Sequence, residues 1–352
     1  MALLDDVRSA LATVIDPEIR QPITDLGMVR SVEVDAGVAR VGIDLTIAAC
    51  PMRDTLSAQV RAAVEAVAGV DEVVVELGAM SDSQRAQLRN QLRGSGPANP
   101  FAESTTQVIA VASGKGGVGK SSVTANLAVA LAAEHRVGVI DADVHGFSIP
   151  RMLGAEQMPT KVDNMLLPPV VHGVKVVSIG MFVPPGQPVV WRGPRGHRAL
   201  QQFLSDVFWG DLDVLLLDLP PGTGDIAISV AELLPTSRLL VVTTPQAAAA
   251  EVAERAGALA AHTHQSVVGV LENMSWLDLP DGTRLEVFGS GGGQQVADRL
   301  SQTLGTDVPL LGQVPIDMAL REAGDAGTPV TISAPQAPAA VALTEVASTL
   351  MG

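Results

Sequence analysis

A glycine-rich segment that follows a short apolar run places the strongest constraint on the fold of this 352-residue chain. The run spans residues 108–112, and the segment after it, residues 113–122, reads SGKGGVGKSS. Gly114 through Ser121 match the pattern Gly-x-x-x-x-Gly-Lys-Ser, and residues 121–133 continue with a helical pattern. Glycines let backbone N–H groups turn around phosphate oxygens, and the positive end of the helix adds to the attraction. The sequence therefore predicts a strand, a phosphate-binding loop and a helix in succession.

Each residue of this loop has an expected role toward a bound nucleotide. Lys120 would reach the β- and γ-phosphates of ATP as a catalytic cation, and the Ser121 hydroxyl would complete the shell of a Mg²⁺ ion. A glycine-rich turn without a ligand is the alternative, and the strand–loop–helix context argues against it. The expected nucleotide-binding residues of the loop are Gly114, Lys115, Gly116, Gly117, Val118, Gly119, Lys120, Ser121 and Ser122.

Lysine is scarce in the chain, yet two lysines lie in this loop. Of the 23 basic residues only Lys115, Lys120, Lys161 and Lys175 are lysines. The pattern Lys-Gly-Gly-x-Gly-Lys-Ser resembles the deviant phosphate loop of the MinD, ParA, arsenical-pump and nitrogenase iron-protein ATPases. The resemblance implies that Lys115 is catalytic and contacts the nucleotide of the partner subunit in a dimer, where it would stabilise transition-state charge as an arginine finger does. A solvated loop charge is the simpler alternative.

Three carboxylates stand at the ends of two apolar runs. Asp141 and Asp143 follow residues 137–140, and Asp218 follows residues 214–217. Open α/β sheets bind their ligands at the carboxyl ends of their strands, so these groups are expected beside the loop. We expect Asp218 to hold Mg²⁺ through water, Asp143 to orient the attacking water by resemblance to the same ATPases, and Asp141 to be structural. A cap on the following helix is the alternative for Asp218 and Asp143.

The pattern of elements divides the chain into two domains and a linker. Residues 1–80 read as a small α+β domain, and residues 81–106 read as a linker whose first part has a helical pattern. Residues 107–352 alternate short apolar runs with amphipathic segments, which predicts a doubly wound, mostly parallel sheet covered on both faces. Helices are expected at 4–14, 52–67, 121–133, 199–207 and 248–261, and strands at 29–34, 39–47, 72–77, 108–112, 137–141, 174–179, 214–218, 239–243 and 267–272.

Composition excludes several functional classes. The 38 acidic residues outnumber the 23 basic ones, and the net charge of −15 disfavours nucleic acid as a partner. The apolar runs fall short of the roughly 20 residues that a membrane span needs, and acids precede the first base at the N-terminus, unlike in a signal peptide. One cysteine excludes a disulfide framework and a cysteine-ligated cluster held by one chain. We expect a cytoplasmic protein that binds neither nucleic acid nor membrane.

Many segments together resemble the Mrp family of iron–sulfur cluster carrier ATPases. They are SGKGGVGKSS, VIDADVHGFSIPRMLG, VVWRGP, LDLPPGTGD, VTTPQ, ENMSW, VFGSGGG and VPIDMALREAGDAGTPV, and ahead of them DPEI, DLGMV and LTIAACP resemble a MIP18-type domain. The resemblance implies Mg²⁺-dependent ATP hydrolysis by a homodimer whose partners are iron–sulfur apoproteins or assembly factors. It also implies that Asn273 contacts the adenine, and that Pro315 and Asp317 flank the base or ribose.

The chain departs from the Mrp family at the cysteines that hold a cluster. Members commonly carry Cys-Pro-x-Cys after the ENMS segment, whereas this chain has Leu279 and Asp281 at those two positions. Four thiolates normally hold such a cluster, so an iron–sulfur cluster is an uncertain cofactor here. The single thiol, Cys50, precedes Pro51 at an expected helix start, where the helix dipole lowers a thiol pKa. Cys50 is either a site for transient metal, cluster or persulfide contact or a small buried apolar residue.

Two other functions are compatible with the loop. One is a ParA-like or MinD-like positioning ATPase, which a net charge of −15 and the absence of a basic C-terminal helix disfavour. The other is a scaffold that uses ATP as a switch, which the missing cluster ligands favour. The leading hypothesis is an Mrp-class ATPase in iron–sulfur protein maturation.

Overall fold

In the computed structural model, the described residues are 2–48, 50–93, 99–101, 104–143, 146–182, 194–222, 224–246 and 249–351. They form two compact units. The first unit comprises Met1–Gly96, Gln157–Pro169 and Asp206–Gly210, and the second comprises Pro97–Glu156, Val170–Ser205 and Asp211–Gly352.

The first unit is a small α+β body. A three-stranded sheet has the order β1-β2-β3, with β1 antiparallel and β3 parallel to β2. Ala36 and Gly37 both have positive φ in the hairpin between β1 and β2, as a two-residue turn of type I′ requires. Helices and sheet enclose one apolar core. The elements are α1 Ala2–Leu11, β1 Val29–Asp35, β2 Val38–Leu45, α2 Arg53–Glu65, β3 Glu72–Ala79 and α3 Asp82–Arg93.

A hairpin from much later in the chain completes this first unit. Strands β6 (Thr160–Val162) and β7 (Met165–Leu167) pair with each other, and the side chains of Val162, Met165 and Leu167 are buried in the first unit's core. The Thr160 hydroxyl donates to Glu18 Oε1 over 3.0 Å. The sequence pattern gave no sign of this hairpin, which lies inside the range 107–352, nor of the return of residues 206–210 to the first unit.

The second unit is built on a nine-stranded sheet in its described part. The strand order is β13-β12-β11-β4-β10-β5-β9-β8, with β14 paired to β12, and only the short edge strands β8 and β13 are antiparallel. The central strands β5, β9 and β10 are buried along their whole length, as their continuous apolar runs predict. The strands are β4 Gln107–Ala112, β5 Val137–Asp141, β8 Val170–Val171, β9 Val174–Ser178, β10 Val214–Asp218, β11 Arg238–Thr243, β12 Val267–Asp278, β13 Arg284–Leu285 and β14 Leu310–Ile316.

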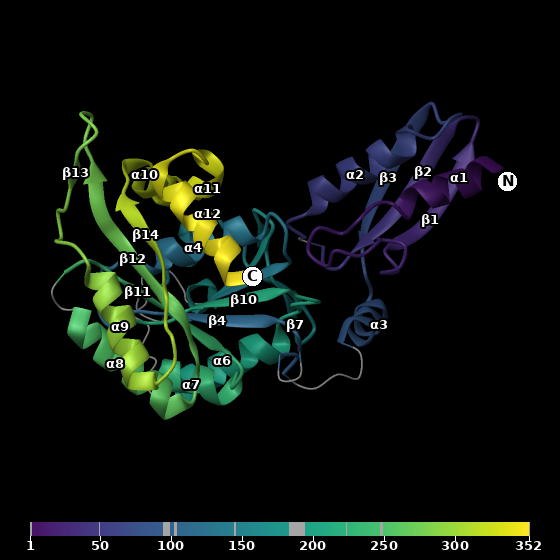
Figure 1. Ribbon diagram of the computed structural model, residues 1–352. Helices are drawn as coiled ribbons and strands as arrows, with labels where there is room; N and C mark the ends of the chain where they lie inside the picture. Colours follow the sequence, from purple (N-terminus) through teal and green to yellow (C-terminus); the bar gives the residue numbers. More distant parts are fainter. Residues whose placement is uncertain are drawn as a thin grey trace. The chain divides into compact units, whose positions relative to one another are not determined.

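Helices cover both faces of this sheet (Figure 1). One group contains α4, α10, α11 and α12, which contact one another, and the other contains α7, α8 and α9, which do the same. The helices are α4 Lys120–Leu131, α5 Ile149–Met152, α6 Pro194–Asp206, α7 Asp225–Leu233, α8 Ala249–Thr263, α9 Gly292–Leu304, α10 Met318–Ala326, α11 Val330–Ser333 and α12 Pro338–Met351, with a 3₁₀ turn, η1, at Ile179–Phe182.

The predicted fold class is confirmed: a mostly parallel, doubly wound sheet follows a small α+β unit. Several elements were not predicted, among them β14, α7, α9 and α12. Strand β12 is also longer than the predicted strand 267–272, and its extension carries Asn273. In the described part of the chain, none of the helices is both long enough and apolar enough to cross a lipid bilayer.

Candidate nucleotide-binding site

The loop between β4 and α4 has the backbone shape that its glycines predict. Gly117 and Gly119 have φ angles of 78° and 80°, in the left-handed region where a side chain is strained. A Cβ atom on Gly119 would also lie 2.3 Å from Nδ2 of Asn273. Gly114 packs closely too, since a Cβ atom there would lie 2.8 Å from Cα of Val252. Only glycine satisfies both the conformation and the space at Gly119.

The loop surrounds a cavity of about 210 Å³ in the second unit. Most of the lining comes from the loop itself, and the rest comes from Asp143, from Ser148 and Met152 at α5, and from Pro221. The cavity opens at the carboxyl ends of β4, β5 and β10, where parallel sheets place their ligands. The lining residues of the loop are Ser113, Lys115, Gly116, Gly117, Val118, Gly119, Lys120, Ser121 and Ser122.

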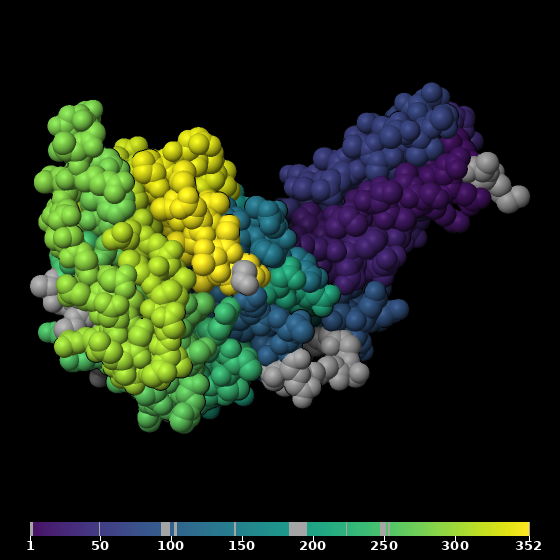
Figure 2. Space-filling view, in the orientation of Figure 1, coloured from purple at the N-terminus to yellow at the C-terminus, as the bar shows by residue number. Residues whose placement is uncertain are grey.

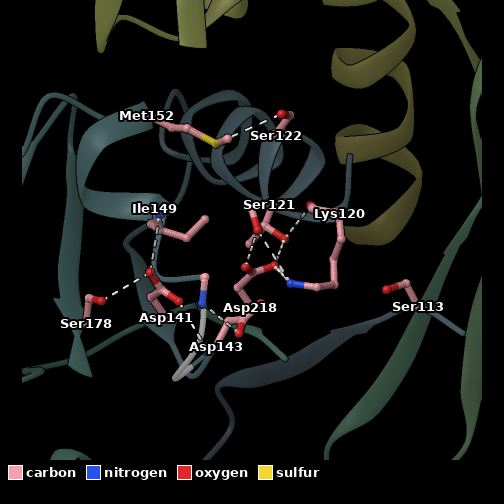
Figure 3. A network of polar contacts seen from close by, with 12 residues as sticks. Ser113, Lys120, Ser121, Ser122, Asp141, Asp143, Ile149, Met152, Ser178 and Asp218 are labelled. Atoms are coloured by element: carbon pink, nitrogen blue, oxygen red, sulfur yellow. Dashed lines mark hydrogen bonds and ion pairs between the residues drawn. The ribbon is translucent and has the colours of Figure 1, made fainter. Parts of the chain in front are cut away.

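A buried polar cluster forms the floor of this site (Figure 3). Lys120 Nζ lies 2.7 Å from Asp218 Oδ1, and the two side chains are 6% and 0% exposed. Ser121 donates its hydroxyl to Asp218 Oδ2 over 2.6 Å, and Thr124 donates to Oδ1 over 2.9 Å. Asp218 at the end of β10 thus accepts from three groups on the first turns of α4. A lysine, a hydroxyl and a carboxylate are thereby held at one point beside the loop.

Asp141 and Asp143 have different surroundings at the end of β5. Asp141 is fully buried and accepts from Ser178 Oγ and from the backbone N–H groups of Asp143 and Ile149. Burial and the negative charge of Asp218 raise the pKa of Asp141 to about 7. Asp143 lines the cavity and accepts from the Gly146 N–H over 3.1 Å. Asp141 therefore supports the backbone that carries Asp143 to the cavity.

Lys115 is held by a group that the sequence pattern did not single out. Its Nζ donates to Oε1 of Gln246, which lies three residues beyond the end of β11. The backbone on either side is tied down as well, because Arg255 Nη1 donates to the Gly114 carbonyl over 2.8 Å and Ser113 Oγ donates to the Lys115 carbonyl over 3.0 Å. Both lysines of the loop are thus engaged, by different elements.

Asn273 lies directly behind the loop. Its Nδ2 donates to the Val118 carbonyl over 2.9 Å, while its buried Oδ1 finds no hydrogen-bond partner among the residues that the structure describes. Its neighbour Met274 has a φ of 59°, a strained conformation for such a side chain that is typical of functional sites. Glu272, fully buried, accepts from the Gly293 N–H and from Gln313. The oxygen of Asn273 is therefore a buried acceptor without a partner in the described part of the chain, and Asn273 is not among the residues that line the cavity.

Pro315 and Asp317 come from the end of β14 and the residue that caps α10. Val314 pairs with Asn273 in the sheet, so buried Pro315 follows directly on a neighbour of Asn273. Asp317 Oδ1 accepts from the Ala319 N–H over 2.8 Å, and Oδ2 accepts from the Ala339 N–H over 3.2 Å. In this structure the Asp317 carboxylate is engaged in fixing α10 and α12.

Cys50 lies in the first unit, and the expected lowering of its pKa is wrong. Burial raises the pKa of the Cys50 thiol to about 11, and the negative charges of Glu18 and Asp16 act in the same direction. The hydrogen bond from the Met52 backbone favours the thiolate, but it is outweighed. Burial raises the pKa of Glu18 itself to about 7. Cys50 is therefore a protonated, buried thiol near an acid rather than an exposed thiolate.

The segment that carries cysteines in the Mrp family is a closed hairpin here, and its tip projects from the body of the second unit (Figures 1 and 2). Leu279 and Thr283 pair across the turn through the Leu279 N–H over 2.9 Å. Asp281 Oδ1 accepts from both the N–H and the hydroxyl of Thr283, and these bonds lower the pKa of Asp281. Arg284 lies over the Trp276 ring at 4.0 Å. Asp281 thus stabilises the turn.

Sequence reasoning missed four residues that organise the site. Thr124 could have been found, because position i+4 places it on the same face of α4 as Lys120. Gln246 lies within the VTTPQ motif, but no spacing rule links it to Lys115. Glu272 lies within the ENMSW segment and Arg255 within the predicted helix 248–261, but no spacing rule links them to their contacts, which reach residues 21 and 141 positions away.

The fold and this site define a P-loop nucleotide-binding protein with two lysines in the loop. The sequence model of a family described as NUBPL iron-transfer P-loop NTPase matches residues 104–351, and one described as iron–sulfur cluster assembly protein matches residues 4–77. The chain belongs to this family of P-loop NTPases, and the resemblance drawn from its motifs is confirmed.

Individual relatives agree with this assignment. An iron–sulfur cluster carrier protein from Mycobacterium leprae is 60% identical over 350 residues, covering 98% of this chain and 91% of the relative. The solved structure of a nucleotide-binding protein from Archaeoglobus fulgidus in complex with ADP is 37% identical, with a TM-score of 0.54, and the match covers 63% of this chain and 86% of that one. The septum site-determining protein MinD from Pyrococcus horikoshii, at 23% identity and a TM-score of 0.52 over 69% of this chain and 94% of that one, shares the fold.

Proposed function

We propose that this protein is a Mg²⁺-dependent ATPase that acts as a carrier or assembly factor for iron–sulfur clusters. The observation that carries the ATPase part is the cluster of Lys120, Ser121 and Asp218 beside a loop that contains a second lysine, Lys115. The carrier part is supported by the name of the Mycobacterium leprae relative and by the family description of iron transfer.

The donors at the loop fit a magnesium ion. The Ser121 hydroxyl and the Asp218 carboxylate, 2.6 Å apart, are hard oxygen ligands of the kind that Mg²⁺ takes, with water filling the remaining positions. Ser121 would bind the ion directly and Asp218 through water. The ion would neutralise charge on the β- and γ-phosphates.

The protein's own groups would divide the remaining work. Lys120 would exchange its ion pair with Asp218 for the β- and γ-phosphates, because a triphosphate offers more negative charge than one carboxylate. Asp143 at the cavity wall would orient the attacking water. By resemblance to the family, the Asn273 amide would contact the adenine, with Pro315 and Asp317 beside the base or ribose. Lys115 would serve the nucleotide of a second copy in a homodimer.

Hydrolysis by purified full-length protein tests the ATPase part. We expect Mg²⁺-dependent phosphate release that Lys120→Ala abolishes, because this change removes the cation nearest the phosphates. Lys161→Ala, at an exposed position of β6, is the matched control and should leave the rate unchanged. A normal rate and normal ATP affinity in Lys120→Ala would refute the assignment of the loop.

The proposed cargo needs a thiol, and the chain offers one. Leu279 and Asp281 cannot supply thiolates, and a carboxylate oxygen is a hard donor that matches the iron of such a cluster poorly. Cys50 in the first unit is the remaining candidate, so any cluster held by the protein should be weakly bound and should depend on Cys50. Partner apoproteins or assembly factors would then receive or supply the cluster.

Anaerobic reconstitution with iron and sulfide tests the cargo. Iron content and absorption spectra of the full-length protein should show a labile cluster that is lost in Cys50→Ser. A stoichiometric cluster in Cys50→Ser would refute the role of Cys50. If the unaltered protein hydrolyses ATP but holds no cluster, the second candidate function, an ATP-switched scaffold, is favoured. Leu279 and Asp281, which stand where the family has cysteines, support this second function.

A further inference from the structure

The two lysines of the loop are held by different chemistry. Lys120 pairs with a carboxylate, Asp218, and both side chains are buried. Lys115, which is only half-buried, instead donates to a neutral amide oxygen, Oε1 of Gln246. A charged acceptor binds an ammonium group more strongly than a neutral one does. The structure therefore holds Lys115 in a defined place by a contact that can be broken.

The residue that holds Lys115 lies outside the cavity, next to α8. Gln246 lies between β11 and α8, and α8 also supplies Arg255, which donates to the Gly114 carbonyl, and Val252, which packs against Gly114. Gln246 does not line the cavity, although Lys115 does. The amide thus draws the ammonium toward the β11–α8 connection of its own chain.

We propose that Gln246 is a positioning residue that retains Lys115 on its own chain and so opposes the contact of Lys115 with a nucleotide bound to a second copy. The proposal rests on the proposed function, in which Lys115 acts across a homodimer. Lys115 must leave Gln246 before it can contact a nucleotide on another copy. The apparent affinity of one copy for another is therefore reduced in proportion to the fraction of chains in which Lys115 is released. Gln246 makes the neutral, releasable contact that keeps this fraction small in the single chain.

Amine labelling tests the retention without requiring hydrolysis. The full-length, nucleotide-free protein is treated with a low concentration of acetic anhydride, and acetylation of Lys115 is measured by mass spectrometry against exposed Lys161 in the same chain. Gln246→Ala should raise Lys115 labelling several-fold, and Gln246→Glu, which adds an ion pair, should lower it. Gln302→Ala, at an exposed site on α9, is the control. Equal Lys115 labelling in all four proteins would overturn the proposal.

The dependence of turnover on protein concentration tests the consequence. Gln246→Ala should reach half-maximal specific activity at a several-fold lower protein concentration than the unaltered chain, and Gln246→Glu at a higher one. Lys115→Ala should itself lose turnover, so the control is ATP-dependent self-association measured by sedimentation velocity. The difference in self-association between the two Gln246 variants should vanish when Lys115→Ala is added to each, since the effect acts through Lys115. An unchanged concentration dependence, or a difference in self-association that persists without Lys115, would overturn the regulatory role. If Lys115 labelling differs between the variants as expected but the unaltered protein hydrolyses no ATP, the proposed function is refuted while the retention of Lys115 is supported.

Discussion

Replacing Asp218 by Asn tests the buried ion pair at the centre of the phosphate site. The change keeps the shape of the side chain and removes its charge, so that Lys120, 6% exposed, loses a carboxylate 2.7 Å away. Leaving one partner of a buried pair uncompensated costs about 3–5 kcal/mol. The charge of Asp218 also raises the pKa of Asp141, so its removal lets Asp141 ionise more readily. We therefore expect the lower end, a loss of about 3 kcal/mol in the free energy of unfolding of the second unit.

Urea titration of the nucleotide-free, full-length protein measures this loss. Hydrogen exchange in peptides from α4 and β10, which belong to the second unit alone, reports the transition of that unit. Asp298→Asn, an exposed carboxylate on α9, is the matched control and should change stability by less than about 0.5 kcal/mol.

A second substitution tests whether the loss of stability in Asp218→Asn comes from the unpaired ammonium group of Lys120. Adding Lys120→Met to Asp218→Asn removes the unpaired ammonium, so the double variant should be more stable than Asp218→Asn alone. The reasoning would be refuted if the double variant lost the sum of the two single losses. A loss below about 1 kcal/mol in Asp218→Asn would refute it equally.

Two further predictions concern the loop glycine and the thiol. Gly119→Ala should reduce ATP affinity at least about tenfold in calorimetric titration, because the left-handed backbone strains any side chain there and Asn273 occupies the space of the methyl group. Gly324→Ala, in an open part of α10, should bind ATP normally. Equal affinities of the two variants would contradict this reasoning. Glu18→Gln should speed alkylation of Cys50 at pH 8–9, because the loss of a nearby negative charge lowers the thiol pKa from about 11. Glu65→Gln, at an exposed site, is the control. Identical pH profiles of alkylation in the two variants would rule out an effect of Glu18 on Cys50.

The parts of the structure that the sequence predicts are those encoded locally. The strands β5 and β10 have the predicted bounds, because a run of buried apolar residues between turn signals needs no knowledge of its neighbours. Strand β14 was missed because Gly312 and Pro315 interrupt its apolar pattern and much of the strand is only half-buried. The β6–β7 hairpin was missed because the core into which it packs is built mainly from residues 7–92 of the first unit, far from it in the chain.

The candidate site divides in the same way. The loop residues and Asp218 could be named from spacing and from the ends of apolar runs, since phosphate binding demands that arrangement. Gln246 and Arg255 could not, because their contacts with the loop depend on how α8 packs beside it. For Cys50 a local rule was outweighed: the start of a helix favours a thiolate, but tertiary burial and the nearby Glu18 raise the thiol pKa instead.

The position of Cys50, the proposed cluster ligand, determines which change can separate cluster binding from ATP hydrolysis. Deleting the first unit would remove Cys50, and we would expect residues 107–352 to hydrolyse ATP without binding a cluster. However, residues 157–169 lie in that fragment while their apolar side chains are buried in the first unit's core. The deletion would expose Val162, Met165 and Leu167 to water, so a loss of activity would reflect the damaged hairpin as much as the missing thiol. Cys50→Ser in the full chain removes only the sulfur, and is therefore the change that separates cargo binding from ATP hydrolysis.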